Sequence, residues 1–334
     1  MVIWPILFGL VGVGYMLWRE LSSDIPQEPL AMAKYGWLFI LLVILCTLLK
    51  DFSGMYRLRV MAGMPLRFRQ LFRIRMLYEF TNAVTPSAAG GATLEVLFIH
   101  REGVMVSKST SMTVLALFLD EAFMVILFPI LLIFIPYHDM FTAGGFFQYG
   151  YFSAFLIGYA LKFVWVTMLF IGIFIKPSVF IKIIGAVFSL KFLRRYRYRG
   201  LRTAVEIREC AKAFKHETLG YWVRMMVSTA GIWTFKFMIA NMAIMIFNPL
   251  SGAANLMCFA RQYILSIVCM IVPTPGGSGF AEVMFDGFLG EYITQAMSIV
   301  VITSIWRLMT YYYYLFAGVI ILPQWLGGKR KANA

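Results

Sequence analysis

The sequence predicts an all-α polytopic integral membrane protein, folded as a single transmembrane domain over residues 1–334. The chain is 61% hydrophobic and only 14% charged, whereas soluble globular domains are roughly 45–50% apolar and about 25% charged. Apolar runs recur from Val2 to Leu322, and several are long enough to cross about 30 Å of hydrocarbon as a helix. Because lipid offers no hydrogen-bond partner to an open backbone, these runs must be helical.

Six apolar runs are expected to be full spans. They cover residues 2–18, 36–50, 111–135, 147–175, 221–247 and 294–322. The first has neither a basic start nor a small-residue cleavage site, so we expect an uncleaved helix that fills 1–35 together with an outer loop. Two repeats follow, at 36–176 and 221–326, on either side of a basic linker at 177–220.

Charged residues between the runs predict the orientation. The stretches 57–75 and 176–215 and the tail after Leu322 are rich in Lys and Arg, whereas 20–34 and 136–150 are not. By the positive-inside rule, the basic stretches and both chain ends are expected on the cytoplasmic side of a prokaryotic cytoplasmic (inner) membrane. The net charge of +14 is therefore attributed to topology, and no nucleic-acid partner is expected.

If this orientation holds, neither the segment 76–100 nor the segment 250–293 can make a single crossing of the membrane. Two clear spans already join the first two basic stretches, so 76–100 must return to the side that it entered from. It is shorter than the ~40 residues that two crossing helices need. The number of spans between 176–215 and the tail likewise requires 250–293 to return to the outer side. It is either a re-entrant hairpin or two complete spans. We expect two re-entrant hairpins of inverted orientation.

Both segments carry a helix-breaking motif followed by an acid. The first reads Thr85-Pro86-Ser87-Ala88-Ala89-Gly90-Gly91 and then Glu95, and the second reads Pro273-Thr274-Pro275-Gly276-Gly277-Ser278-Gly279 and then Glu282. Interrupted helices in matching positions of inverted repeats are typical of transporter binding sites. Such breaks leave backbone N–H groups that can hold a phosphate. The alternative is a kink in which the glycines only permit close helix packing.

Arg307 lies in the middle of the last run, with Thr310 and Tyr311 on or near its helical face. A charge at that depth is costly, so it should face a cavity or a carboxylate. Its planar guanidinium, with that of Arg261, could hold a lipid phosphodiester. The alternative is a structural ion pair with Glu282 or Glu121.

Four more residues are candidates for charge coupling: Asp120, Glu121, Glu79 and Lys236. Asp120 and Glu121 are adjacent and cannot both face one way on a helix, so at least one should meet a cation, with Arg261 and Lys236 as candidates. Proton transfer by either acid is the alternative. Glu79 either lines the cavity of the first motif or lies at the membrane interface.

No metal site and no cofactor are expected. The four cysteines and three histidines lack metal-ligand spacing, and the sequence contains no phosphate-binding Gly-x-x-x-x-Gly-Lys-Ser/Thr loop.

Several segments resemble a known family. Pro-Thr-Pro-Gly-Gly-Ser-Gly-Phe-Ala-Glu at 273–282 and Trp306-Arg307-Leu308-Met309-Thr310-Tyr311-Tyr312 are similar to the transmembrane, flippase-like domain of lysylphosphatidylglycerol synthases. Asn82, the first motif and the Asp120-Glu121 pair are similar too. The resemblance implies movement of a phospholipid between leaflets, in the best-known members an aminoacylated one. Because few residues follow Leu322, we expect a stand-alone member without the aminoacyl-transferase domain.

The sequence therefore favours a lipid flippase or lipid transporter over an enzyme, with a membrane phospholipid as its partner. Headgroup contacts are expected from Arg307, Arg261, Thr310, Tyr311, Gly276, Gly277, Gly279, Glu282, Pro86, Gly90, Gly91 and Glu95. The alternatives are a non-catalytic partner of an envelope-modifying enzyme docked through 176–215, an intramembrane lipid transferase with Glu282 or Asp120 as base, and a small-solute transporter. Lipid identity, direction, energy source and oligomeric state, a dimer included, stay open.

Overall fold

The computed structural model describes residues 31–85, 88–141, 148–175, 217–271, 277–294 and 296–327, and the single positions 205, 212 and 214. Within these ranges every regular element is a helix, which confirms the all-α prediction. The expected first span at 2–18, nearly all of the basic linker and the basic tail lie outside the described residues.

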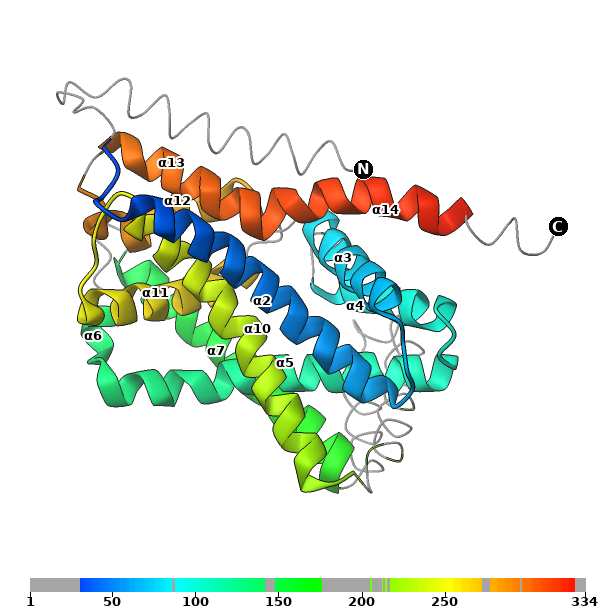
Figure 1. Ribbon diagram of the computed structural model, residues 1–334. Helices are drawn as coiled ribbons and strands as arrows, with labels where there is room; N and C mark the ends of the chain where they lie inside the picture. Colours follow the sequence, from blue (N-terminus) through cyan, green and yellow to red (C-terminus); the bar gives the residue numbers. More distant parts are fainter. Residues whose placement is uncertain are drawn as a thin grey trace.

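Long helices form most of the bundle (Figure 1). They are α2 (Gly36–Ala62), α5 (Val106–Phe134), α7 (Gln148–Phe170) with its π-helical continuation η1 (Ile171–Ile175), α10 (Leu219–Met245), α11 (Gly252–Ile271), and α13 (Ala296–Arg307), which continues through the π-helical η5 (Leu308–Tyr312) into α14 (Tyr313–Gly327).

Six stretches of the described residues are long and apolar enough to cross a membrane. They are Gly36–Ala62, Val106–Phe134, Phe152–Ile175, Leu219–Met245, Gly252–Met270 and Ser298–Leu326. Five of them overlap spans that the sequence predicted, and the sixth lies inside the segment 250–293. The chain is therefore a multi-pass membrane protein.

Local sequence explains several helix boundaries. α2 ends where Gly63 adopts a left-handed φ of 61°, a conformation that glycine takes without a steric penalty. α3 (Phe68–Val84) stops just before Thr85-Pro86, since a residue preceding proline disfavours helical geometry. Thr218 caps α10, and its hydroxyl accepts the backbone N–H of Tyr221 at 3.3 Å.

The prediction that 57–75 is a basic stretch outside the membrane needs a correction. α2 continues to Ala62, well beyond its expected end at residue 50, so Arg57 lies inside a helix. Arg57 and Arg75 are both buried, and each pairs with acids of the bundle. Sequence alone placed both outside the membrane because an arginine without a nearby acid normally marks the end of a span.

The two segments expected to be re-entrant form unequal pairs of helices. α3 and α4 (Ala88–Arg101) have 17 and 14 residues and lie side by side. α11 has 20 residues, enough for about 30 Å, whereas its partner α12 (Phe280–Leu289) has only 10. In the segment 250–293, which the sequence left as a re-entrant hairpin or two complete spans, one helix is thus long enough to span and the other is not. The re-entrant path of both segments stays a prediction.

The apolar core is divided in two along the long helices. On α2, Cys46 belongs to one cluster of buried apolar side chains and Met55 to the other. On α10 the same division separates Met225 from Phe237. Charged and polar side chains occupy the interval between the clusters, which lies near the middle of both helices. We call this interval the charged layer.

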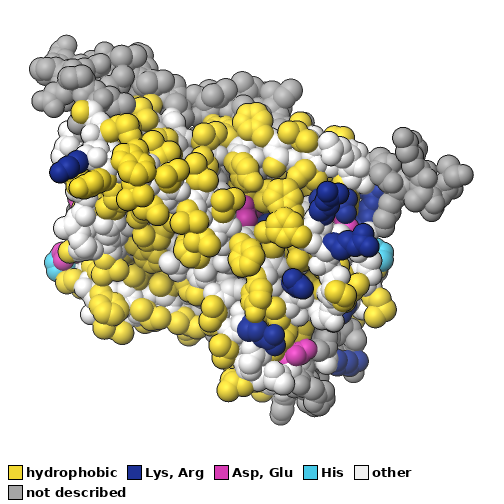
Figure 2. Space-filling model, viewed as in Figure 1, with side chains coloured by type: hydrophobic (Ala, Val, Ile, Leu, Met, Phe, Trp, Pro, Cys, Tyr) yellow, Lys and Arg dark blue, Asp and Glu magenta, His cyan; other side chains and the backbone are white. Residues whose placement is uncertain are grey.

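The outer surface is largely apolar on the face shown in Figure 2, as expected for contact with lipid. On α2, for example, Leu48 and Phe52 are more than half exposed. The Lys and Arg side chains on this face gather mainly toward the end where α3 and α4 lie (Figures 1 and 2). The surface therefore has an apolar body and a basic end.

Candidate functional site

Five side chains from three helices form a closed network in the charged layer: Lys50 and Asp51 of α2, Arg75 and Glu79 of α3, and Tyr314 of α14. Lys50 Nζ lies 3.3 Å from Glu79 Oε1 and donates to the Tyr314 hydroxyl at 2.9 Å. Tyr314 in turn donates to Asp51 at 3.0 Å. Arg75 Nε lies 3.3 Å from Asp51 Oδ1, and its guanidinium also pairs with Glu79. Two cations and two carboxylates thus balance one another inside the bundle.

Helical spacing and one glycine bring this network together. Arg75 and Glu79 are four residues apart, so they share the face of α3 that meets α2. Gly54 lies one turn after Lys50, and a Cβ at that position would lie only 2.8 Å from Arg75 Nε. The absence of a side chain at Gly54 therefore lets the guanidinium reach Asp51.

A second ion pair joins α2 to α5. Arg57 donates from its two terminal nitrogens to the two oxygens of Asp120, at 2.6 and 2.9 Å. From α10, Thr229 accepts from Arg57 at 3.1 Å and Trp233 Nε1 donates to Asp120 at 3.0 Å. Asp120 thus meets a cation, as expected for at least one of the two acids, but that cation is Arg57 of the extended α2 and neither of the candidates Arg261 and Lys236.

The neighbouring acid, Glu121, faces a different helix, as its adjacency to Asp120 predicted. Its partner is Lys162 of α7, whose ammonium group donates to the Glu121 carboxylate. Arg261, Lys236 and Arg307 were the candidate partners, but none of them fills that role.

Two charges of the layer lack a partner of opposite charge at ion-pair distance among the described residues. Lys236 of α10 lies over the ring of Trp233, with Nζ 4.5 Å from the ring centroid. Glu95 of α4 is buried. Thr229, Trp233 and Lys236 are spaced four and three residues apart, which places Lys236 on the helical face that meets Asp120. With these two residues, and with the Arg57–Asp120 pair that adjoins it at Trp233, the charged layer contains four basic side chains (Lys50, Arg57, Arg75, Lys236) and four acidic ones (Asp51, Glu79, Glu95, Asp120).

Arg307 forms the ion pair with Glu282 that the sequence left open as an alternative. Arg307 Nε lies 3.0 Å from Glu282 Oε1, and Nη2 donates to Oε2 at 3.1 Å and to the Gly277 carbonyl at 3.2 Å. The side chains are only 6% and 0% exposed. A lipid phosphate would have to displace Glu282 to reach this guanidinium.

Arg261 lies at the opposite end of α12 from Arg307. It donates to the carbonyl oxygens of Phe288 and Asp139, each at 3.1 Å, and pairs with Glu291 at 2.8 Å. Asp139 belongs to α6 (Tyr137–Phe141) and Glu291 to the short η4 (Gly290–Tyr292). The two arginines therefore hold the two ends of α12 and do not face one common site.

The two helix-breaking motifs differ in the structure. Gly277 and Gly279 have φ values of 70° and 82° just before α12, values that no α-helix contains. The second motif therefore interrupts the helix, as predicted. Gly90 and Gly91, in contrast, lie inside the first turn of α4. A Cβ at Gly91 would overlap the side chain of Asn82, which supports the close-packing alternative for that glycine. Pro86 and Gly276 lie outside the described residues.

One helix touches the surroundings of both motifs. Arg307 contacts Gly277 of the second motif, and the Tyr311 hydroxyl donates to the Ala83 carbonyl, just before the first motif, at 3.4 Å. Thr310 donates to the Trp306 carbonyl of its own helix at 2.7 Å. The chain directly after Arg307 is the π-helical turn η5, which contains Thr310 and Tyr311. Such a distortion is found often at functional sites. The motifs are therefore linked through a single irregular turn.

Sequence reasoning missed six charged residues of these pairs. They are Lys50, Asp51, Arg57, Arg75, Lys162 and Glu291. The available signal was position: Lys162 stands alone in the middle of its apolar run, and Lys50-Asp51 lie in the middle of α2 once its apolar sequence is followed to Ala62.

Two comparisons place the chain among known proteins. The family described as "Lysylphosphatidylglycerol synthase TM region" matches residues 2–318. A UPF0104 membrane protein of Archaeoglobus fulgidus is 24% identical over 327 residues, which cover 93% of each chain.

Proposed function

The chain belongs to the family of lysylphosphatidylglycerol synthase transmembrane regions, and on that premise we propose that it is a lipid transporter. It moves a phospholipid between the leaflets of the cytoplasmic membrane and performs no chemistry on it. The observation that carries the proposal is the charged layer, where four basic and four acidic side chains gather inside an apolar bundle. Ionisable groups inside membrane segments are costly and are characteristic of substrate paths.

The charges of the layer that have no ion-pair partner among the described residues suit a headgroup that carries a phosphate. Lys236 has no carboxylate at ion-pair distance among the described residues, so a phosphate can approach it without displacing a protein partner. Glu95 offers a carboxylate to an ammonium group of the same headgroup, as in an aminoacylated or zwitterionic lipid. Both charges of such a lipid would find a counterpart halfway through the bundle.

Arg307 and Arg261 have a different role from Lys236 in this proposal. Each already has a carboxylate partner, Glu282 and Glu291 respectively. A phosphate reaches them only after one of these pairs opens. We therefore assign first contact to Lys236 and treat the two arginines as later contacts along the path.

Reconstitution into vesicles tests the proposal. The purified protein is incorporated with a fluorescent phospholipid, and an impermeant quencher added outside reports how fast the labelled lipid changes leaflet. Headgroups that are anionic, zwitterionic and aminoacylated are compared. Wild type should accelerate the movement of at least one of them, Lys236→Met should abolish the acceleration, and the exposed control Arg224→Gln should retain it.

Movement no faster than in protein-free vesicles for all three headgroups would contradict the proposal. An equal rate for wild type and Lys236→Met would contradict the role of that lysine.

A second candidate function is a non-transporting partner of an envelope-modifying enzyme. The observation that favours it is the buried Arg307–Glu282 pair, whose exposure of 6% and 0% is that of a structural contact. The basic segment 176–215 would then serve as the docking site. Neutralising Arg194, Arg195, Arg197 and Arg199 should release a co-purifying enzyme in this case, while wild type moves no lipid.

A further inference from the structure

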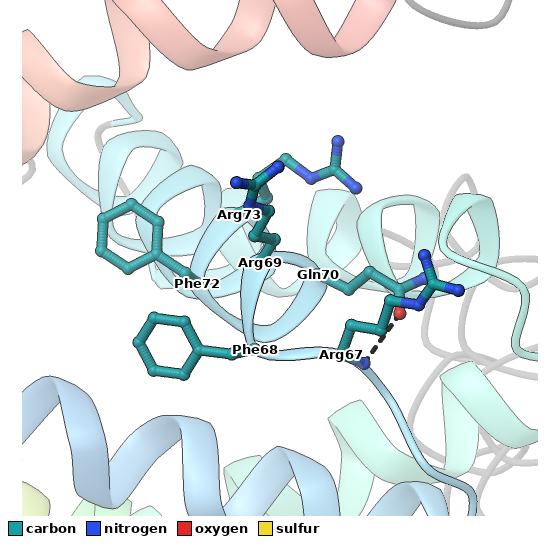
Figure 3. Close-up of a pocket in the computed structure, with 6 residues that line it drawn as sticks. All are labelled: Arg67, Phe68, Arg69, Gln70, Phe72 and Arg73. Atoms are coloured by element: carbon teal, nitrogen blue, oxygen red, sulfur yellow. Dashed lines mark hydrogen bonds between the residues drawn. The ribbon is translucent and has the colours of Figure 1, made fainter.

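A hollow of about 460 Å³ opens at the start of α3, outside the charged layer (Figure 3). It is lined by six consecutive or nearly consecutive residues: Arg67, Phe68, Arg69, Gln70, Phe72 and Arg73. Three guanidinium groups and two aromatic rings are therefore concentrated within about two turns of one helix, at the basic end of the bundle (Figure 2).

The hollow has an aromatic side and a basic side. Figure 3 shows the rings of Phe68 and Phe72 lying together on one side of the helix, while Arg69 and Arg73 project from another. The ring centroids are 6.4 Å apart and the ring planes differ by 20°. Phe68 is 64% exposed. A helix with exposed phenylalanines on one face and arginines on another is typical of a surface where acyl chains meet lipid headgroups.

Gln70 holds the base of the hollow in place. Its side-chain oxygen accepts the backbone N–H of Arg67 at 2.9 Å (Figure 3), and its amide nitrogen donates to the Glu102 carbonyl at 3.1 Å. The start of α3 is thus tied to the end of the neighbouring α4. A ligand would meet a preformed surface, which limits the entropy lost on binding.

The hollow has an excess of positive charge. Arg73 pairs with Glu102 at 3.0 Å. Arg67 and Arg69 are exposed, and among the described residues neither has a carboxylate at ion-pair distance. Two guanidinium groups therefore remain available to an anion from outside the protein.

We propose that this hollow binds the headgroup of an anionic phospholipid from the adjoining leaflet. Arg67 and Arg69 hold the phosphodiester by charge-assisted hydrogen bonds, while Phe68 and Phe72 contact the acyl chains. This site is separate from the charged layer and does not depend on transport. A protein that moves no lipid between leaflets would still bind lipid here.

Lipid binding by matched variants tests this site. The test variant is Arg67→Gln with Arg69→Gln, and the control is Arg59→Gln with Arg224→Gln, which removes the same charge from exposed positions near the end of α2 and the start of α10. Native mass spectrometry counts the molecules of dioleoyl phosphatidylglycerol or dioleoyl phosphatidylcholine that each protein retains. Wild type and control should retain phosphatidylglycerol preferentially, and the test variant should bind it about 30-fold more weakly.

Two further arms distinguish a lipid from a free anion. Phe68→Ala with Phe72→Ala should weaken the binding of phosphatidylglycerol, and inorganic phosphate should not compete for the site. Equal losses in test and control variants, or equal retention of the two lipids, would overturn the site. Competition by inorganic phosphate would overturn the assignment to a lipid. Unchanged melting temperatures of the lipid-free variants confirm that folding is intact.

Discussion

The two terminal nitrogens of Arg57 donate to the two oxygens of Asp120, at 2.6 and 2.9 Å, across the contact between α2 and α5. This bidentate contact gives both geometric specificity and strength, because the planar guanidinium matches the carboxylate. It also lies beside Trp233, whose ring contacts Lys236, so a structural pair and the proposed headgroup contact share one neighbour.

Removal of either partner of this pair should destabilise the protein strongly. Arg57→Met leaves Asp120, whose side chain is only 16% exposed, without its cation, at a cost of about 3 kcal/mol in the free energy of unfolding. Asp120→Leu should cost a similar amount, and the double variant clearly less than the sum. A double-mutant cycle on unfolding in detergent measures the coupling. Additive effects would show that the two charges do not stabilise each other.

Substitution of two lysines of the charged layer by methionine should affect the stability of the protein differently. Lys50→Met removes the cation that contacts Glu79 and Tyr314, so a loss of about 3–5 kcal/mol in unfolding free energy is expected. Lys236→Met removes no ion pair of the described residues and should change stability by about 1 kcal/mol or less. Lipid movement should nevertheless stop in Lys236→Met. A stability loss equal to that of Lys50→Met would make Lys236 a structural residue.

The contact between α3 and α4 should depend on the absence of a side chain at Gly91. Gly91→Ala places a methyl group against Asn82 and should cost about 1–3 kcal/mol. Nothing lies within 4 Å of a Cβ at Gly252, so Gly252→Ala serves as the control and should be neutral or slightly stabilising. Adding Asn82→Ala to Gly91→Ala should restore part of the melting temperature. No restoration would mean that the methyl group acts elsewhere.

The Arg307–Glu282 pair allows structure and transport to be separated. Arg307→Met and Glu282→Leu should each destabilise the protein because each leaves one buried charge, whereas the double variant should recover most of the stability. The proposed function predicts that the stable double variant moves lipid more slowly than wild type in vesicles. An unchanged rate would assign the pair to the fold alone.

The type of each element was predictable because lipid forces an apolar run to be helical, and five of the expected spans are present among the described residues. The end of α2 was not predictable. Lys50 and Asp51 look like the edge of a span because their partners lie elsewhere in the sequence, with Arg75 24 residues from Asp51 and Tyr314 264 residues from Lys50.

The candidate site was predictable only in part. Asp120, Glu121 and Arg307 were identified as charges at membrane depth from their place in apolar runs, and the adjacency of the two acids correctly predicted that they diverge. Glu282 was offered as a partner of Arg307, but the partners of the two acids were not predictable, because Arg57 is 63 residues from Asp120 and lies in a stretch whose composition indicates a loop. Pairing depends on which helices become neighbours, and a single sequence does not contain that information.

The contact between Lys50 and Tyr314 has a consequence for biosynthesis. α2 must enter the bilayer carrying a lysine and an aspartate in its middle, each costing roughly 2.5–3.5 kcal/mol on insertion scales. Arg75 and Glu79 follow soon after in α3, whereas Tyr314 belongs to the last helix of the described residues and is translated 264 residues after Lys50. The network thus remains incomplete while most of the protein is being translated. A chain that is truncated before α14 would keep Lys50 and Asp51 without their hydroxyl partner, an exposed defect that membrane proteases and insertion chaperones can recognise.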